Sequence, residues 1–167
     1  MPTYSDAELA KLTEQLAECL LAKQYKVVTV ESCTGGWLAK CCTDMAGSSN
    51  WFEHGFVTYS NTAKQQYSHV TARTLLRFGA VSQQTATEMA SGALKNSNAD
   101  IAVAITGIAG PGGATTNKPI GKVCFAVAIA KHHCNAYQYQ FSGDREQVRR
   151  HAVATAIELI LENIKAL

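Results

Sequence analysis

The segment Asp100–Thr106, with the sequence DIAVAIT, constrains the fold more strongly than any other part of this 167-residue chain. Between its two polar ends it is apolar throughout, and such a run is typical of a strand that is covered on both faces. A second short run, Lys26–Val30 (KVVTV), is rich in β-branched residues and also predicts a strand. A sheet whose centre is covered twice requires helices on both of its sides.

The rest of the chain supplies such helices in alternation with strands. Ser5, followed three residues later by Glu8, has the pattern of a capping box at the start of a first helix, which carries leucines at helical spacing. Further helices are expected at about 37–45, 61–67, 71–78, 82–95 and 144–164, and further strands at 54–59, 122–130 and 134–141. The last two strands are close enough to form a hairpin. We therefore predict one domain over residues 1–167, an α/β fold in the form of a three-layer α/β/α sandwich with a mixed sheet.

The composition excludes several other classes of protein. Apolar residues make up 47% of the chain and charged residues 17%, and the net charge of +2 offers no basic stripe for nucleic acid. No segment reaches the roughly 18 consecutive apolar residues of a membrane span, and the N-terminus shows no secretory signal. The six cysteines include no CxxC pair, and the histidines show no metal-binding spacing. We therefore expect a cytoplasmic protein with reduced thiols and no metal, nucleic-acid or membrane partner.

A glycine-rich turn, Glu31–Gly36 (ESCTGG), follows the first predicted strand and precedes a helix. The backbone N–H groups of such a turn, together with the helix N-terminus, are able to bind a phosphate or an oxyanion. On this interpretation Ser32 is a nucleophile, and Cys33 is a weaker rival because no histidine is visibly placed to activate it. The same loop is also explained as a capped helix start whose glycines permit the turn.

Two later loops also follow predicted strands, and in open α/β sheets ligands bind outside the carboxyl ends of the strands. Tyr59 ends one strand and Lys64 begins the next helix. A desolvated lysine is able to activate a serine, and a tyrosine to pass on a proton, although an amphipathic tyrosine and a solvated lysine explain the same pattern. The loop 106–121 contains several glycines, which either let the backbone approach a ligand closely or make the loop flexible. Neither loop has a Walker A or Rossmann pattern.

Together these loops form an ordered set of motifs: ESCTGG at 31–36, GSSNWFEHGFVTYSNTAK at 47–64, GAVS at 79–82, TGIAGPGG at 106–113 and KPIG at 118–121. In this order they resemble the CinA C-terminal domain family, whose stand-alone members are nicotinamide-nucleotide amidases. The resemblance implies an α/β/α fold, a homodimer, and hydrolysis of nicotinamide mononucleotide to nicotinate mononucleotide and ammonia in pyridine-nucleotide (NAD) salvage. It implies neither a cofactor nor a metal. Because some stand-alone relatives are inactive, the alternative is a nucleotide-binding or regulatory paralogue on the same fold.

The resemblance also implies roles for individual residues. Ser32 is the implied nucleophile, with Lys64 as its general base and Tyr59 assisting. The implied substrate-binding residues are Thr34, Gly35, Gly36, Ser48, Gly107 and Arg145. Arg145 is a candidate contact for the substrate's phosphate, beside a helix N-terminus, and N–H groups of the Gly35–Gly36 turn or the 107 loop are candidates for the oxyanion. This mechanism requires the pKa of Lys64 to fall from about 10.4 towards about 7–8, through burial or nearby positive charge.

Overall fold

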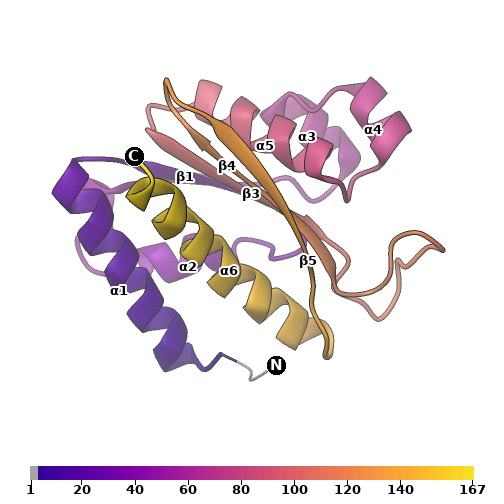
Figure 1. The fold of residues 1–167 in the computed structure, drawn as a ribbon, viewed down its shortest axis with the longest axis horizontal. Coiled ribbons are helices and arrows are strands. Elements are labelled where there is room, and N and C mark those ends of the chain that lie inside the picture. Colours follow the sequence, from indigo (N-terminus) through magenta and orange to yellow (C-terminus); the bar gives the residue numbers. More distant parts are fainter. Residues whose placement is uncertain (1–3) are drawn as a thin grey trace.

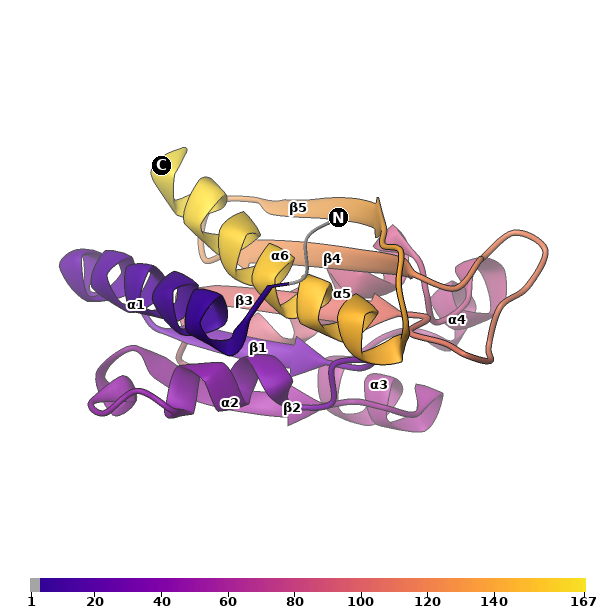
Figure 2. The same ribbon diagram turned by 90° about the horizontal axis from the view of Figure 1, so that it is seen from below.

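The structure, a computed structural model, describes residues 4–167 and contains a five-stranded sheet between two layers of helices (Figures 1 and 2). The α-helices of this described part are Asp6–Lys23 (α1), Trp37–Thr43 (α2), Asn61–Ser68 (α3), Ala72–Phe78 (α4), Gln83–Lys95 (α5) and Arg145–Lys165 (α6). Its strands are Val27–Glu31 (β1), Phe52–Val57 (β2), Ile101–Gly107 (β3), Lys122–Ile129 (β4) and Cys134–Gln140 (β5). A short 3-10 turn, Ser48–Asn50 (η1), lies before β2.

The sheet is mixed and has the strand order β2-β1-β3-β4-β5. β1 is parallel to both β2 and β3, whereas β3 with β4 and β4 with β5 are antiparallel, and the last pair forms the predicted hairpin. Helices α1, α2 and α6 cover one face, and α3, α4 and α5 lie on the other (Figure 1). The predicted three-layer α/β/α sandwich with a mixed sheet is therefore confirmed.

The central strand β3 explains why its sequence is apolar throughout. Side chains alternate between the faces of a strand. Ile101, Val103 and Ile105 pack into the core beneath α1 and α6, whereas Ala102 and Ala104 pack against α5. All five are fully buried. The small alanines leave room for α5 to lie close to the sheet.

Gly92 in α5 brings α3 against the same face. A Cβ atom at this position would lie 1.9 Å from the backbone oxygen of Ser68, the last residue of α3. No side chain fits into that space, so the two helices are in direct backbone contact. This packing fixes α3, the helix that follows β2, beside the carboxyl ends of the parallel strands.

Most predicted boundaries agree with the structure to within two residues, and two of the differences affect the site. β2 ends at Val57, so Thr58 and Tyr59 lie in the connection to α3 and not in the strand. β1 includes Glu31, which the sequence pattern placed in the loop. The turn η1 was not predicted. None of the helices in the described residues is long and apolar enough to cross a membrane.

Candidate active site

Three hydroxyl side chains, those of Ser32, Thr58 and Thr106, lie at the carboxyl ends of the parallel strands β1, β2 and β3. The N–H of Ser32 donates to the backbone oxygen of Ile105 at 2.9 Å, and the N–H of Thr58 donates to that of Glu31 at 2.8 Å. The pairing of the strands therefore continues into these residues, and Ser32 lies between Thr58 and Thr106. The nucleophile predicted from the sequence is thus held by a rigid sheet edge.

Lys64 is buried directly beside Ser32, although 32 positions separate them in the sequence. Ser60 caps α3 and directs its first turn across the sheet edge. The Nζ atom of Lys64 lies 2.9 Å from Ser32 Oγ, 2.8 Å from the backbone oxygen of Thr58 and 3.3 Å from that of Tyr59. The lysine is 1% exposed, and none of the carboxylates in residues 4–167 forms an ion pair with it. Burial lowers the pKa of Lys64 to about 8.

These three contacts suit a neutral amine that acts as a base. A neutral lysine has two N–H donors and one lone pair. The backbone oxygens of Thr58 and Tyr59 occupy the two donors, which leaves the lone pair for the hydroxyl proton of Ser32. The geometry therefore allows Lys64 to accept the proton of the serine.

Glu31 corrects the expectation for the Gly35–Gly36 turn. Its carboxylate is fully buried and accepts hydrogen bonds from the hydroxyl of Thr34 and from three N–H groups at the start of α2, those of Gly36, Leu38 and Ala39. The N–H of Gly35 donates to the backbone oxygen of Ser32 at 3.1 Å. The N–H groups of Gly35, Gly36, Leu38 and Ala39 are therefore used by the protein's own acceptors and are not offered to a phosphate or an oxyanion in this structure, whereas the roles of Thr34, Gly35 and Gly36 in substrate binding stay predictions. The signal that could have revealed this is an acid at the end of an apolar strand, directly before a glycine-rich turn.

Cys33 is a poorer nucleophile than its neighbour. Burial raises the pKa of its thiol to about 12, and the thiolate is the reactive form of cysteine. A Cβ atom at Gly107 would lie 3.1 Å from the sulfur of Cys33 and 2.8 Å from a methyl group of Val123, so glycine permits the close packing there. Gly107 thus lies against the Ser32 loop, and its role in substrate binding stays a prediction.

Tyr59 and Arg145 form a pair on the rim of the site. Arg145, the first residue of α6, donates to the phenol oxygen of Tyr59 at 3.3 Å and to the backbone oxygen of Gly110 at 2.7 Å. Tyr59 is 61% exposed and contacts Lys64 through its backbone oxygen only. Its phenol therefore faces Arg145, and the structure joins the predicted tyrosine to the predicted phosphate contact instead of to the lysine.

Ser48 lies at the opposite end of the strands from Ser32, where β1 and β2 begin. It begins η1, and Trp51 just after this turn accepts a hydrogen bond from the N–H of Val27, the first residue of β1. Ser32 follows the last residue of the same strand, so about 16 Å of extended chain separates the two regions. Within a single chain the structure therefore does not bring Ser48 to Ser32, because spacing in the sequence does not show at which end of the strands a loop lies, and its role in substrate binding stays a prediction.

Among the described residues, no group of three or more His, Cys, Asp or Glu side chains is arranged to hold a metal ion. Fold and geometry together define an α/β protein with a buried serine–lysine pair at the carboxyl edge of its parallel strands. The chain belongs to the CinA C-terminal domain family, whose model matches residues 9–164. The family expected from the motifs is thus confirmed.

Relatives cover nearly the whole chain. It is 53% identical over 156 residues to the nicotinamide-nucleotide amidohydrolase PncC of Escherichia coli (strain K12). The aligned region covers 93% of this chain and 94% of that protein. It is 46% identical over 157 residues to the nicotinamide-nucleotide amidohydrolase PncC of Enterobacter agglomerans, covering 94% and 96%. The crystal structure of the competence/damage inducible protein CihA from Agrobacterium tumefaciens matches with a TM-score of 0.91 at 39% identity, covering 97% and 98%.

Proposed function

We propose that this protein is a nicotinamide-nucleotide amidohydrolase, which converts nicotinamide mononucleotide and water to nicotinate mononucleotide and ammonia in pyridine-nucleotide salvage. Two relatives that match it over nearly their whole length carry that name. The observation that carries the proposal is the contact of 2.9 Å between Lys64 Nζ and Ser32 Oγ in a buried position. Hydrolysis of an amide through a serine ester needs such an activated hydroxyl.

The reaction proceeds through an ester on Ser32. Neutral Lys64 takes the hydroxyl proton while Oγ forms a bond to the carboxamide carbon. The tetrahedral intermediate then collapses, and its C–N bond breaks as the ammonium of Lys64 returns the proton to the leaving nitrogen, so that ammonia departs. Lys64, neutral again, removes a proton from a water molecule that attacks the ester. Ser32 regains its proton from Lys64 as nicotinate mononucleotide leaves.

Arg145 is the proposed contact for the substrate's phosphate. The N-terminus of α2 is already occupied by the carboxylate of Glu31. Arg145 forms no ion pair with the carboxylates of the described residues, and its guanidinium lies at the rim beside Tyr59. A guanidinium and a phenol are both able to bind phosphate oxygens. This interaction would favour the mononucleotide over free nicotinamide.

Ammonia release from the purified protein tests the proposal directly. We expect release with nicotinamide mononucleotide and much less with nicotinamide, and mass analysis should identify nicotinate mononucleotide as the product. Ser32→Ala and Lys64→Met should each abolish release, whereas Ser49→Ala, at an exposed position in η1, should not. A wild-type protein that binds the mononucleotide but releases no ammonia would instead be the regulatory paralogue.

The same preparation, analysed by sedimentation, tests the proposed homodimer.

A further inference from the structure

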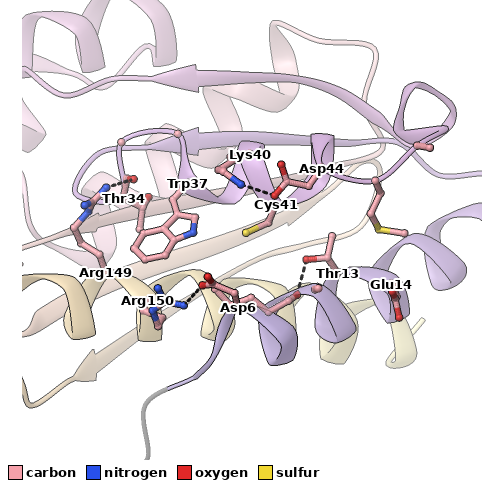
Figure 3. A pocket seen from close by; sticks show the side chains of 16 residues that line it. Asp6, Thr13, Glu14, Thr34, Trp37, Lys40, Cys41, Asp44, Arg149 and Arg150 are labelled. Carbon is pink, nitrogen blue, oxygen red and sulfur yellow. Dashed lines mark hydrogen bonds and ion pairs between the residues drawn. The ribbon is translucent and has the colours of Figure 1, made fainter.

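A second basic residue holds the loop that carries Ser32, from the opposite side of the sheet. Arg149 in α6 donates from Nε to the backbone oxygen of Cys33 at 3.1 Å and from a terminal nitrogen to that of Thr34 at 3.0 Å. Its guanidinium also lies 5.3 Å from the ring centre of Trp37. Figure 3 shows Arg149 beside Thr34 and Trp37, at one end of a groove between α1, α2 and α6. No local pattern in the sequence marks this residue.

The direction of these hydrogen bonds determines where the loop's N–H groups point. In a trans peptide the C=O and the N–H point in opposite directions, and the only cis peptide among the described residues is Gly110–Pro111. Because Arg149 draws the oxygen of Cys33 towards α6, the N–H of Thr34 is directed towards the other side of the loop. That side holds Lys64, since α3 lies across the sheet from α6 (Figure 1).

The N–H of Thr34 has no acceptor of its own within the described residues, and the residue is fully buried. Within residues 4–167 this N–H donates no hydrogen bond to another residue, and neither does the N–H of Cys33, whereas the N–H groups of Gly35 and Gly36 are both engaged. An oxyanion needs a donor that is positioned before the charge develops. Arg149 forms no ion pair with the described carboxylates, so no carboxylate competes for its charge with the two carbonyl groups that it binds.

We infer that Arg149 is a positioning residue, which holds the Cys33–Thr34 peptide so that the N–H of Thr34 stabilises the oxyanion. This inference rests on the proposed amidohydrolase function. The arrangement acts on the transition state and not on substrate binding. Loss of Arg149 should therefore lower kcat and leave KM and the pH midpoint of the reaction, which reports Lys64, in place.

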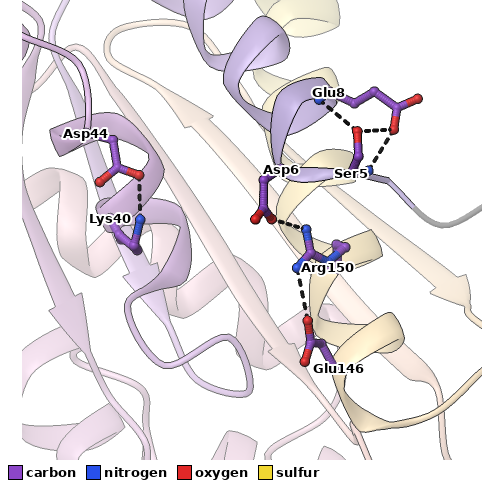
Figure 4. A network of polar contacts seen from close by, with 7 residues as sticks. All are labelled: Ser5, Asp6, Glu8, Lys40, Asp44, Glu146 and Arg150. Atoms are coloured by element: carbon purple, nitrogen blue, oxygen red, sulfur yellow. Dashed lines mark hydrogen bonds and ion pairs between the residues drawn. The ribbon is translucent and has the colours of Figure 1, made fainter.

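The neighbouring Arg150 provides a matched control. It also lies over Trp37, at 4.9 Å from the ring centre, but it pairs with Asp6 and Glu146 on the surface (Figure 4). Arg149→Met should lower kcat by about 10- to 100-fold, somewhat less than the roughly 100- to 1,000-fold loss on deleting an oxyanion donor outright. Arg150→Met should retain the wild-type kcat. Far-UV circular dichroism and thermal unfolding establish that both variants are folded.

Two rescue measurements separate positioning from a general structural role. Arg149→Lys should recover part of the loss, since an ammonium donates to a carbonyl but lacks the guanidinium's fork. Arg149→Ala should regain activity when guanidinium chloride is added well below denaturing concentrations. The groove beside Arg149, with a volume of about 930 Å³, gives a small cation access to the vacated position.

Replacing threonine 34 by its α-hydroxy acid analogue exchanges the N–H for an ester oxygen and tests the donor itself; the ester also makes the Cys33 carbonyl that Arg149 binds a weaker acceptor. The resulting ester should lose kcat at least as strongly as Arg149→Met, and combining both changes should cause little further loss. An active wild type together with equal kcat values for Arg149→Met and Arg150→Met would overturn the inference, as would multiplicative losses or a shifted pH midpoint in Arg149→Met. A wild type that releases no ammonia would instead refute the proposed function, and this inference with it.

Discussion

Replacing Lys64 by methionine is expected to change how the unfolding free energy depends on pH while it abolishes ammonia release. The wild-type amine is 1% exposed and forms no ion pair with a carboxylate of the described residues. Protonating it therefore places an unpaired charge in the interior, which costs free energy. Methionine fills a similar volume without that charge.

The size of the effect follows from the pKa. A fall from 10.5 to about 8 corresponds to a penalty of about 3 kcal/mol on the folded state. Below about pH 8 the folded and unfolded chains both carry the proton, so the whole penalty is present. Between about pH 8 and 10.5 the folded chain has released the proton and the unfolded chain still binds it, so the unfolding free energy rises with pH. Above this window both states are neutral and the penalty is gone.

Urea unfolding of the wild type and Lys64→Met at several pH values measures this change. The unfolding free energy of the variant minus that of the wild type should fall by about 3 kcal/mol between about pH 7 and about pH 10.5, and groups that titrate in both proteins cancel in the difference. Lys11→Met, at an exposed position on α1, is the control and should show a difference that does not vary with pH. A constant difference between wild type and Lys64→Met over this range would refute the argument that Lys64 is desolvated.

Four further predictions concern the same edge of the sheet. The kcat/KM for nicotinamide mononucleotide should rise with pH and level off above about pH 8, because the reaction needs the neutral form of Lys64; a flat profile would contradict this. Glu31→Gln should lower the unfolding free energy by about 1–3 kcal/mol in urea, since its amide N–H groups would face backbone donors, and should reduce kcat; unchanged values would show that the cap is dispensable. Gly92→Ala should cost about 1–3 kcal/mol or more by forcing α3 away from α5, and should also slow ammonia release, since α3 carries Lys64. Cys33→Ala should retain most activity, and its inactivation with intact folding would favour the thiol as nucleophile.

Local signals in the sequence were sufficient to place most helices and strands. The capping box at Ser5 and Glu8 is present, and Ser82 caps α5 as expected. These features depend on residues three or four positions apart, so their pattern is visible without the fold. The approach of Lys64 to Ser32 was also within reach, because both follow parallel strands whose carboxyl ends meet at one edge.

The features that the sequence did not reveal depend on which groups the polar side chains and backbone donors contact in the folded chain. The Gly35–Gly36 turn has the composition of an anion site, but the competing carboxylate of Glu31 belongs to a strand residue whose side chain turns back onto α2. Ser48 and Tyr59 belong to the same sequence motif, but strand β2 lies between them and places them at opposite ends of the strands. Arg149 contacts the Ser32 loop although more than a hundred residues separate them in the sequence. No local pattern in the sequence shows such a contact.

Two basic residues hold the Ser32 loop from opposite sides of the sheet, and their chemistry differs as their tasks require. A base must be able to lose its proton. Of lysine and arginine, only lysine does so when it is buried, whereas a guanidinium remains charged. A residue that orients two adjacent carbonyl groups needs several donors in a fixed geometry, which the guanidinium of Arg149 provides and an ammonium does not. Between them, Glu31 engages the N–H groups at the start of α2. The N–H groups of Cys33 and Thr34 then remain without an acceptor among the described residues. In the proposed reaction the hydroxyl of Ser32 attacks the carbonyl carbon, and the N–H of Thr34 receives the charge that forms on its oxygen.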